Sequence, residues 1–63
     1  RELFIEAQAQ INDGKNKNYE FNLDGLFMYY EGRTIGEAIQ AFLLDRPNAL
    51  SHITRITLVG IVP

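Results

Sequence analysis

Apolar and polar residues alternate along the first part of the chain, from Glu2 to Ile11. Because successive side chains of a β-strand point to opposite faces, this period of two predicts a half-buried strand. A helix is the alternative, since alanine, glutamine and glutamate are good helix formers. Helical spacing from Leu3, however, would put Glu6 and Gln10 on the apolar side, so the alternation favours a strand.

A polar segment, Asn12 to Asn18, separates this strand from a second alternating stretch, Tyr19 to Leu23. The Asn, Asp and Gly residues of the polar segment tolerate positive φ angles, so we expect a tight reversal of the chain there. In the second stretch Tyr19, Phe21 and Leu23 share one face, which we predict to be the buried one.

The dipeptide Asp24-Gly25 decides how the following stretch is arranged. Between alternating apolar residues, Asp-Gly is a strong hairpin signal, because the two central positions of such a turn need positive φ. Alternatively, Gly25 forms a β-bulge inside one long strand that runs to about Glu31. We favour the hairpin, in which the inward face of the next strand carries Leu26, Met28 and Tyr30. Its outward face carries Phe27 and Tyr29.

A capping box marks the start of one predicted helix. Thr34 and Glu37 are three residues apart, so the threonine hydroxyl can accept from the Glu37 amide while the glutamate reaches back. We expect the helix to end before Pro47, because the residue before a proline is pushed out of helical geometry. Apolar residues recur at helical spacing in between and predict one buried stripe. This stripe consists of Ile35, Ala38, Ile39, Phe42 and Leu43.

The last stretch, Ile53 to Val62, follows a predicted loop and is rich in β-branched residues, which pack well on a sheet. Strict alternation puts Ile56, Leu58 and Val62 on one face. It puts Arg55, Thr57, Val59 and Ile61 on the other. Residues 1–63 are therefore predicted to form one α+β domain, with one helix packed on one face of a small antiparallel sheet. The order is β-β-β-α-β with four strands, or β-β-α-β with three if Asp24-Gly25 is a bulge; strands joined by turns are expected to pair as antiparallel neighbours.

Composition narrows the classes of function. The chain has no cysteine and one histidine, so we expect no disulfide, metal site or cofactor. Six basic and eight acidic residues give a net charge of −2, which disfavours nucleic-acid binding, since neutralising phosphates needs basic residues. No apolar run reaches the roughly 18 residues of a membrane span, so no membrane partner is expected. The missing cysteines favour a reducing, cytoplasmic setting.

No set of residues in the sequence supports catalysis. Ser51 and His52 are neighbours, and adjacent side chains of an extended chain point apart, so they do not form a nucleophile–base pair. Asp13 and Asp24 fall in predicted turns, where aspartate usually bonds its own backbone. The segment Gly32 to Gly36 lacks the lysine and glycine spacing of a phosphate-binding loop, and helix capping explains it better. We therefore expect a protein that is not an enzyme.

The sheet face that the helix leaves uncovered is the most unusual predicted feature. It would carry aromatic side chains that together expose roughly several hundred Å², an area that is often functional. The alternative is a register slip by one residue, which would move Phe27 and Tyr29 under the helix. The candidate interaction surface consists of Phe4, Phe27, Tyr29, Arg55, Val59 and Ile61.

Two functions of different class fit this surface. The first is a protein-interaction module that forms a homodimer, or binds another protein, through the uncovered face or an open edge strand. So small a domain buries little apolar surface alone, which favours a partner. The alternative is a single-stranded RNA binder whose aromatic residues stack on bases. Its phosphate contacts would come from Lys15, Lys17, Arg33 and Arg55. The acidic charge favours the first function.

Overall fold

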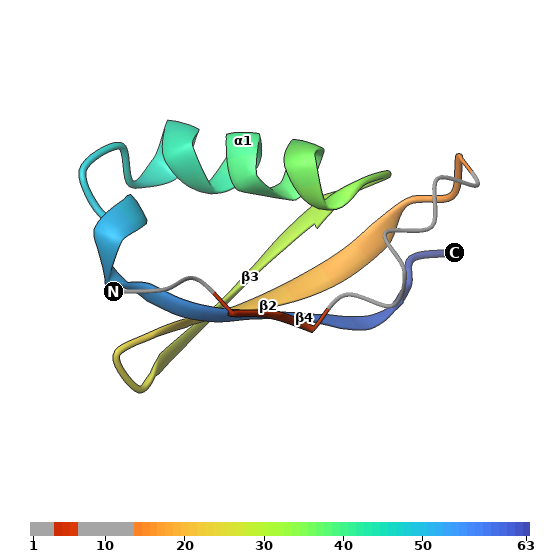
Figure 1. The fold of residues 1–63 in the computed structure, drawn as a ribbon. Helices are drawn as coiled ribbons and strands as arrows, with labels where there is room; N and C mark the ends of the chain where they lie inside the picture. Colours follow the sequence, from red (N-terminus) through yellow and green to blue (C-terminus); the bar gives the residue numbers. More distant parts are fainter. Residues whose placement is uncertain (1–3, 7–13) are drawn as a thin grey trace.

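This computed structural model describes residues 4–6 and 14–63. They form a four-stranded sheet with one helix packed across it (Figure 1). The elements are β1 (Phe4–Glu6), β2 (Lys17–Leu23), β3 (Leu26–Gly32), α1 (Ile35–Asp45), a 3₁₀ turn (Leu50–His52) and β4 (Ile53–Ile61). In space the strands lie in the order β1-β4-β2-β3. The predicted α+β class is confirmed, with one helix packed on a sheet in which β4, β2 and β3 are antiparallel neighbours.

Strands β2 and β3 form the hairpin that the Asp-Gly pair predicts. They pair without interruption from Lys17 opposite Gly32 to Leu23 opposite Leu26. The turn residue Asp24 has a φ of 53° and the glycine after it a φ of 99°, the left-handed values that a two-residue hairpin turn requires. The hairpin is thus confirmed and the bulge excluded, although β2 begins at Lys17, two residues earlier than the alternation indicates.

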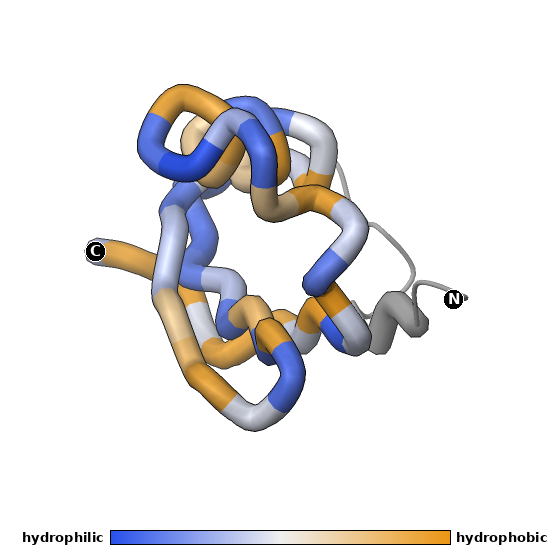
Figure 2. The backbone as a smooth tube through the Cα atoms, turned by 90° about the vertical axis from the view of Figure 1, so that its left-hand side faces the viewer, coloured by the Kyte–Doolittle hydropathy of each residue, from blue (hydrophilic) through white to orange (hydrophobic). Residues whose placement is uncertain are grey.

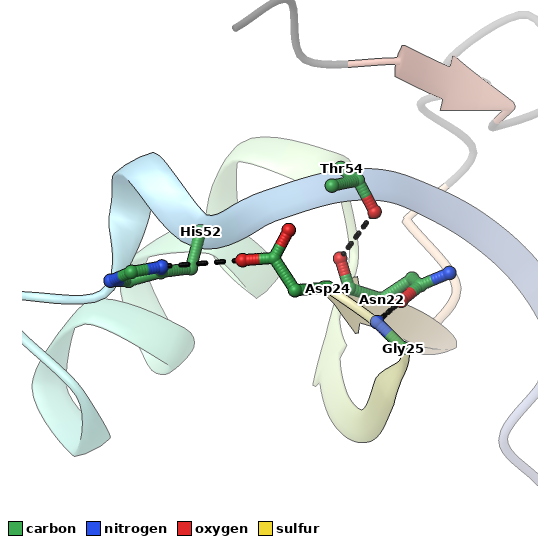
Figure 3. A network of polar contacts seen from close by, with 5 residues as sticks. All are labelled: Asn22, Asp24, Gly25, His52 and Thr54. Atoms are coloured by element: carbon green, nitrogen blue, oxygen red, sulfur yellow. Dashed lines mark hydrogen bonds and ion pairs between the residues drawn. The ribbon is translucent and has the colours of Figure 1, made fainter.

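Strand β4 pairs with β2 through two irregularities. Ile53 lies opposite Leu23 and Arg55 opposite Asn22, so Thr54 has no partner in the register and forms a bulge. The Thr54 hydroxyl donates a hydrogen bond of 3.0 Å to the Asn22 carbonyl (Figure 3). Because of this extra residue, Ile53 and Ile56, which are three positions apart, both reach the buried face.

A second bulge in β4 changes the sheet face to which the side chains at the end of the strand point. Leu58 and Gly60 are paired with consecutive residues of β2, which leaves Val59 as the extra residue. Beyond it, Ile61 lies opposite Lys17, a buried residue on the same face as the core. Strict alternation placed Ile61 on the opposite face, so that prediction is wrong.

Strand β1 pairs with β4 in parallel, with Phe4 opposite Arg55 and Glu6 opposite Thr57. The expectation that the first strand would be the antiparallel neighbour of the second is therefore wrong. Parallel neighbours need a long crossover connection, and here the chain passes through β2, β3 and α1 before it reaches β4. The rest of the strand predicted for residues 2–11, and residues 12–13 of the predicted turn, lie outside the described residues.

The core lies between α1 and the sheet. Phe42 of α1 stacks on Phe21 of β2 at a centroid distance of 5.2 Å, and Tyr30 of β3 meets both rings edge-on. Leu26 was predicted inward but is 60% exposed, because the hairpin diverges from α1 (Figure 1). The buried core consists of Tyr19, Phe21, Leu23, Ile35, Ala38, Phe42, Ile53 and Ile56, which confirms the predicted inward faces of β2 and of the helix.

The start of the helix lies very close to the sheet at Gly32, the last residue of β3. A Cβ atom there would lie 2.6 Å from the Ala38 backbone nitrogen and 2.8 Å from Glu37 Cβ. The predicted capping box holds this end of the helix, since Thr34 Oγ1 accepts from the Glu37 amide at 3.2 Å. Glu37 in turn accepts from the Arg33 amide at 2.9 Å. The start of α1 is therefore pressed against β3.

Candidate interaction surface

The sheet face turned away from α1 is covered by none of the described helices and strands (Figure 1). The register of β4, β2 and β3 arranges its side chains in rows that cross the strands. One row consists of Arg55, Asn22 and Phe27, and the next consists of Thr57, Glu20 and Tyr29. Each row thus ends in an aromatic residue at the β3 edge.

The two aromatic residues of β3 lie on the uncovered face, as the sequence predicts. Phe27 is 54% exposed and Tyr29 is 55% exposed, which excludes the one-residue slip. The Tyr29 hydroxyl donates a hydrogen bond of 2.9 Å to Glu20 on the neighbouring strand. This bond raises the pKa of Tyr29 above the ordinary value of 10.0. The ring is therefore held against β2 while its edge stays exposed.

A polar strip divides the predicted surface into two parts. Strand β2 lies between β3 and β4 and presents Asn18, Glu20 and Asn22 to this face, all partly exposed. Val59, which is 54% exposed at the second β4 bulge, is thus separated from the aromatic residues of β3. Hydrophobic and hydrophilic positions are interspersed along the backbone of the sheet when the molecule is viewed from the end of α1 (Figure 2).

The remaining predicted surface residues are only partly brought together. Phe4 lies in β1, opposite Arg55 in the register, and Arg55 is exposed on β4. Ile61 is 56% exposed but pairs with Lys17, on the face of the core. The structure therefore concentrates the exposed apolar side chains of the hairpin on β3, where Leu26 joins the two aromatic residues.

Strand β3 is an edge of the sheet, with no strand beyond it among the described residues. Backbone groups of an antiparallel pair alternate between facing the partner and facing away. Leu23 and Leu26 close the turn, so the backbone groups of Leu26, Met28 and Tyr30 face β2. Those of Phe27, Tyr29 and Glu31 face away from the sheet. The edge thus offers three N–H and three C=O groups in a line with exposed apolar side chains.

Strand β3 lacks several of the devices that usually protect an edge, although it carries one charged residue, Glu31, near its end. Its seven residues contain no lysine and no proline, and its register with β2 has no bulge. Natural proteins use such devices, or a covering segment, to prevent edge strands from pairing with other chains. The regular edge of β3 is therefore suited to receiving another strand.

One buried cation was missed by the sequence reading. Lys17 is 2% exposed, and its ammonium group donates to the carbonyl oxygens of Lys15 at 2.8 Å and Arg33 at 3.0 Å. The alternation contained a signal for this position, since Lys17 is in phase with the buried residues Tyr19 and Phe21. The lysine joins the start of β2 to the segment before α1.

The single histidine belongs to a polar network at the hairpin end (Figure 3). His52 Nδ1 lies 3.3 Å from the Asp24 carboxylate, and both side chains are largely exposed. Asn22 Oδ1 accepts from the Gly25 amide at 2.7 Å in the same network. These contacts connect the turn to the loop before β4. His52 therefore has a structural contact in this network.

Two further properties concern only residues 4–6 and 14–63. Within them, no group of three or more His, Cys, Asp or Glu side chains could hold a metal ion. No helix there is long and apolar enough to cross a membrane.

A shallow apolar groove of about 300 Å³, lined by Gln40, Leu43 and Leu44, lies on α1, and Leu44 is 89% exposed.

Comparison of the chain with protein-family models, with curated proteins and with solved structures found no match.

Proposed function

We propose that the protein is a non-enzymatic interaction module that self-associates through the uncovered face of its sheet and the edge strand β3. One observation carries this proposal: two aromatic residues, Phe27 and Tyr29, are more than half exposed on a regular edge strand. An edge that is long, apolar and unprotected tends to pair with another chain. Association would cover both the rings and the outward-facing backbone groups.

The size of the apolar surface sets the strength that such a contact can have. A buried aromatic side chain covers about 150–250 Å², so a half-exposed ring can still bury roughly 100 Å², or roughly 2–3 kcal/mol. Two rings from each of two copies then contribute roughly 8–12 kcal/mol. Association costs an estimated 4–15 kcal/mol in lost freedom. We therefore expect a dimer that dissociates in the micromolar range or weaker.

The structure weakens the support for RNA binding as the alternative. Lys17, one of four basic residues which that function requires, is buried on the opposite face and bonded to backbone carbonyls. Glu20 lies in the middle of the uncovered face, between Thr57 and Tyr29, where its charge would repel phosphates. Self-association does not depend on basic residues and is compatible with both observations.

The proposal is tested by measuring the solution mass with light scattering over a dilution series from roughly 1 µM to 1 mM. The wild-type mass should rise toward twice the monomer mass. Phe27→Asp should keep it at the monomer value, because a charge would be buried in the contact. Leu44→Asp is the matched control: Leu44 is 89% exposed on α1, so this variant should behave like the wild type.

Two outcomes would count against the proposal. A wild-type mass that stays monomeric at every concentration would exclude the homodimer. A mass that rises equally in Phe27→Asp would show that this face is not the contact. Binding of a fluorescent oligouridylate that is lost in Phe27→Asp, together with a monomeric mass, would support the RNA alternative instead.

A further inference from the structure

We infer that two copies join edge to edge, with β3 of one antiparallel to β3 of the other around a two-fold axis at Met28. This inference rests on the proposed self-association and deepens it, because it names the edge, the partner and the register. The result would be one continuous sheet across both copies. Isologous contacts of this kind are the commonest way in which identical chains associate.

The backbone of β3 restricts the possible registers. The backbone N–H and C=O groups that face away from β2 belong to Phe27, Tyr29 and Glu31, because these residues alternate with those whose backbone groups bond to β2. In an antiparallel self-pairing, these residues must face one another for the hydrogen bonds to form. Registers whose axis falls on a residue meet this condition. The axis at Met28 centres the apolar segment Leu26–Tyr30, and the axis at Tyr29 centres the whole strand Leu26–Gly32.

The side chains distinguish these two registers. With the axis at Met28, Phe27 lies opposite Tyr29 of the second copy, and Leu26 lies opposite Tyr30. Every side chain of the segment Leu26–Tyr30 then meets an apolar or aromatic partner, which is favourable between neighbouring strands.

With the axis at Tyr29, by contrast, Glu31 would lie opposite Phe27 of the second copy. Gly32 would lie opposite Leu26 and would leave that exposed side chain without a partner side chain. In the Met28 register, Glu31 lies opposite Gly25, where no side chain opposes its charge. The match of apolar and charged positions therefore favours the axis at Met28.

The position of α1 is compatible with this pairing. The start of the helix lies close against β3 at Gly32, four positions beyond the proposed axis. In the paired strands the two copies of Gly32 are eight positions apart along the strand direction, or roughly 26 Å at about 3.3 Å per residue. The two helix starts therefore lie at opposite ends of the contact and do not compete for one space.

The other edge of the sheet is less suited to such a contact. Strand β1 has three residues, whereas β3 has seven. The irregularities of the sheet are both in β4, so they do not twist the β3 edge away from a partner. A second copy therefore finds its longest regular edge at β3.

Single-cysteine cross-linking tests the register directly, because the chain has no cysteine of its own. Met28→Cys should form a disulfide-linked dimer under mild oxidation, since facing Cα atoms of a non-hydrogen-bonded pair are about 4.5 Å apart. A mixture of Phe27→Cys and Tyr29→Cys should give several-fold more linked dimer than either variant alone. Because these two positions are exposed, the mixture keeps the test valid if Met28→Cys folds poorly.

Arg55→Cys and Val59→Cys serve as controls for packing of one uncovered face on another. If they cross-link and the β3 variants do not, while the wild-type mass is dimeric, the inference fails but the proposed self-association stands. If Tyr29→Cys links to itself better than Met28→Cys, the register is wrong. A wild-type mass that is monomeric at every concentration overturns both.

Discussion

The two faces of the β2–β3 hairpin carry similar residues in very different environments. On the covered face, Tyr19 and Phe21 are at most 1% exposed, whereas Phe27 and Tyr29 on the other face are more than half exposed. All four residues stand at odd positions, but the hairpin register pairs odd positions of β2 with even positions of β3. The odd residues of β2 therefore lie under the helix, and the odd residues of β3 lie on the other face. The covered face stabilises the monomer, and the uncovered face leaves apolar surface for a second molecule.

The largest expected effect comes from comparing the loss of a phenylalanine ring in the core with the loss of one on the uncovered face. Phe42→Ala should cost about 3–5 kcal/mol, because Phe42 is fully buried and stacked on Phe21. A chain of 63 residues has a stability of only about 3–9 kcal/mol, so this variant should be largely unfolded. Phe27→Ala should cost less than about 1 kcal/mol. Urea unfolding at low protein concentration measures both, and equal losses would contradict the comparison.

The next effect probes how closely the covered face meets the helix. Gly32→Ala should destabilise the protein by roughly 1–3 kcal/mol, because its Cβ would lie 2.6 Å from a backbone atom of α1. Gly60→Ala is the control, since nothing lies within 4 Å of a Cβ there, and its cost should be below about 0.5 kcal/mol. Thermal unfolding measures the loss of stability in each variant. A Gly32→Ala variant as stable as the wild type would mean that the helix can move away freely.

A smaller effect distinguishes Tyr30, which is partly buried against the core, from the exposed Tyr29. The Tyr30 hydroxyl donates a 2.6 Å hydrogen bond to Asp45 at the end of α1, so Tyr30→Phe should cost about 0.5–1.5 kcal/mol at neutral pH. Tyr29→Phe removes the bond to Glu20 on the uncovered face and should cost less, because it ties no helix to the sheet.

The pH dependence of Tyr30 has a definite sign. Desolvation, and then the bond to Asp45, raise the pKa of Tyr30 above the ordinary value of 10.0. The stability that this group contributes is therefore complete below about pH 10 and is lost as the pH rises through the higher folded-state pKa. Unfolding curves of wild type and Tyr30→Phe should converge in that alkaline range. A difference that grows with pH there would contradict this account.

The smallest effect is expected at the hairpin end, away from both the core and the aromatic edge. His52→Ala should cost less than about 0.5 kcal/mol, because the pair with Asp24 is largely exposed. Thr54→Val, which removes the hydrogen bond to the Asn22 carbonyl at the bulge, should cost more, about 1 kcal/mol. A reversed order in chemical unfolding would mean that the His52 contact, and not the bulge, holds the turn.

The elements that the sequence predicted correctly are those whose signals are local. Thr34 and Glu37 are one turn apart and cap the helix, and Asp24-Gly25 forms a turn of two residues. The faces of β2 and β3 followed from alternation, because their mutual register is unbroken. Phe27 and Tyr29 were thereby placed on the uncovered face from sequence alone.

The features that could not be predicted depend on contacts between distant segments. The bulges at Thr54 and Val59 exist only because β4 is matched to β2, and neither residue type marks a bulge by itself. For the same reason the alternation of β4 misplaced Ile61. The pairing of β1 with β4 depends on topology and has no local sign in the sequence.

The order of strands in the sheet has a consequence for how the chain folds during its synthesis. The hairpin of β2 and β3 is local and can form as soon as both strands have left the ribosome. Strand β1 is made before them, but its partner β4 comes after β2, β3 and α1 in the order of the described elements. The earliest strand must therefore wait for the latest one, and until then the β4 side of β2 is a second open edge.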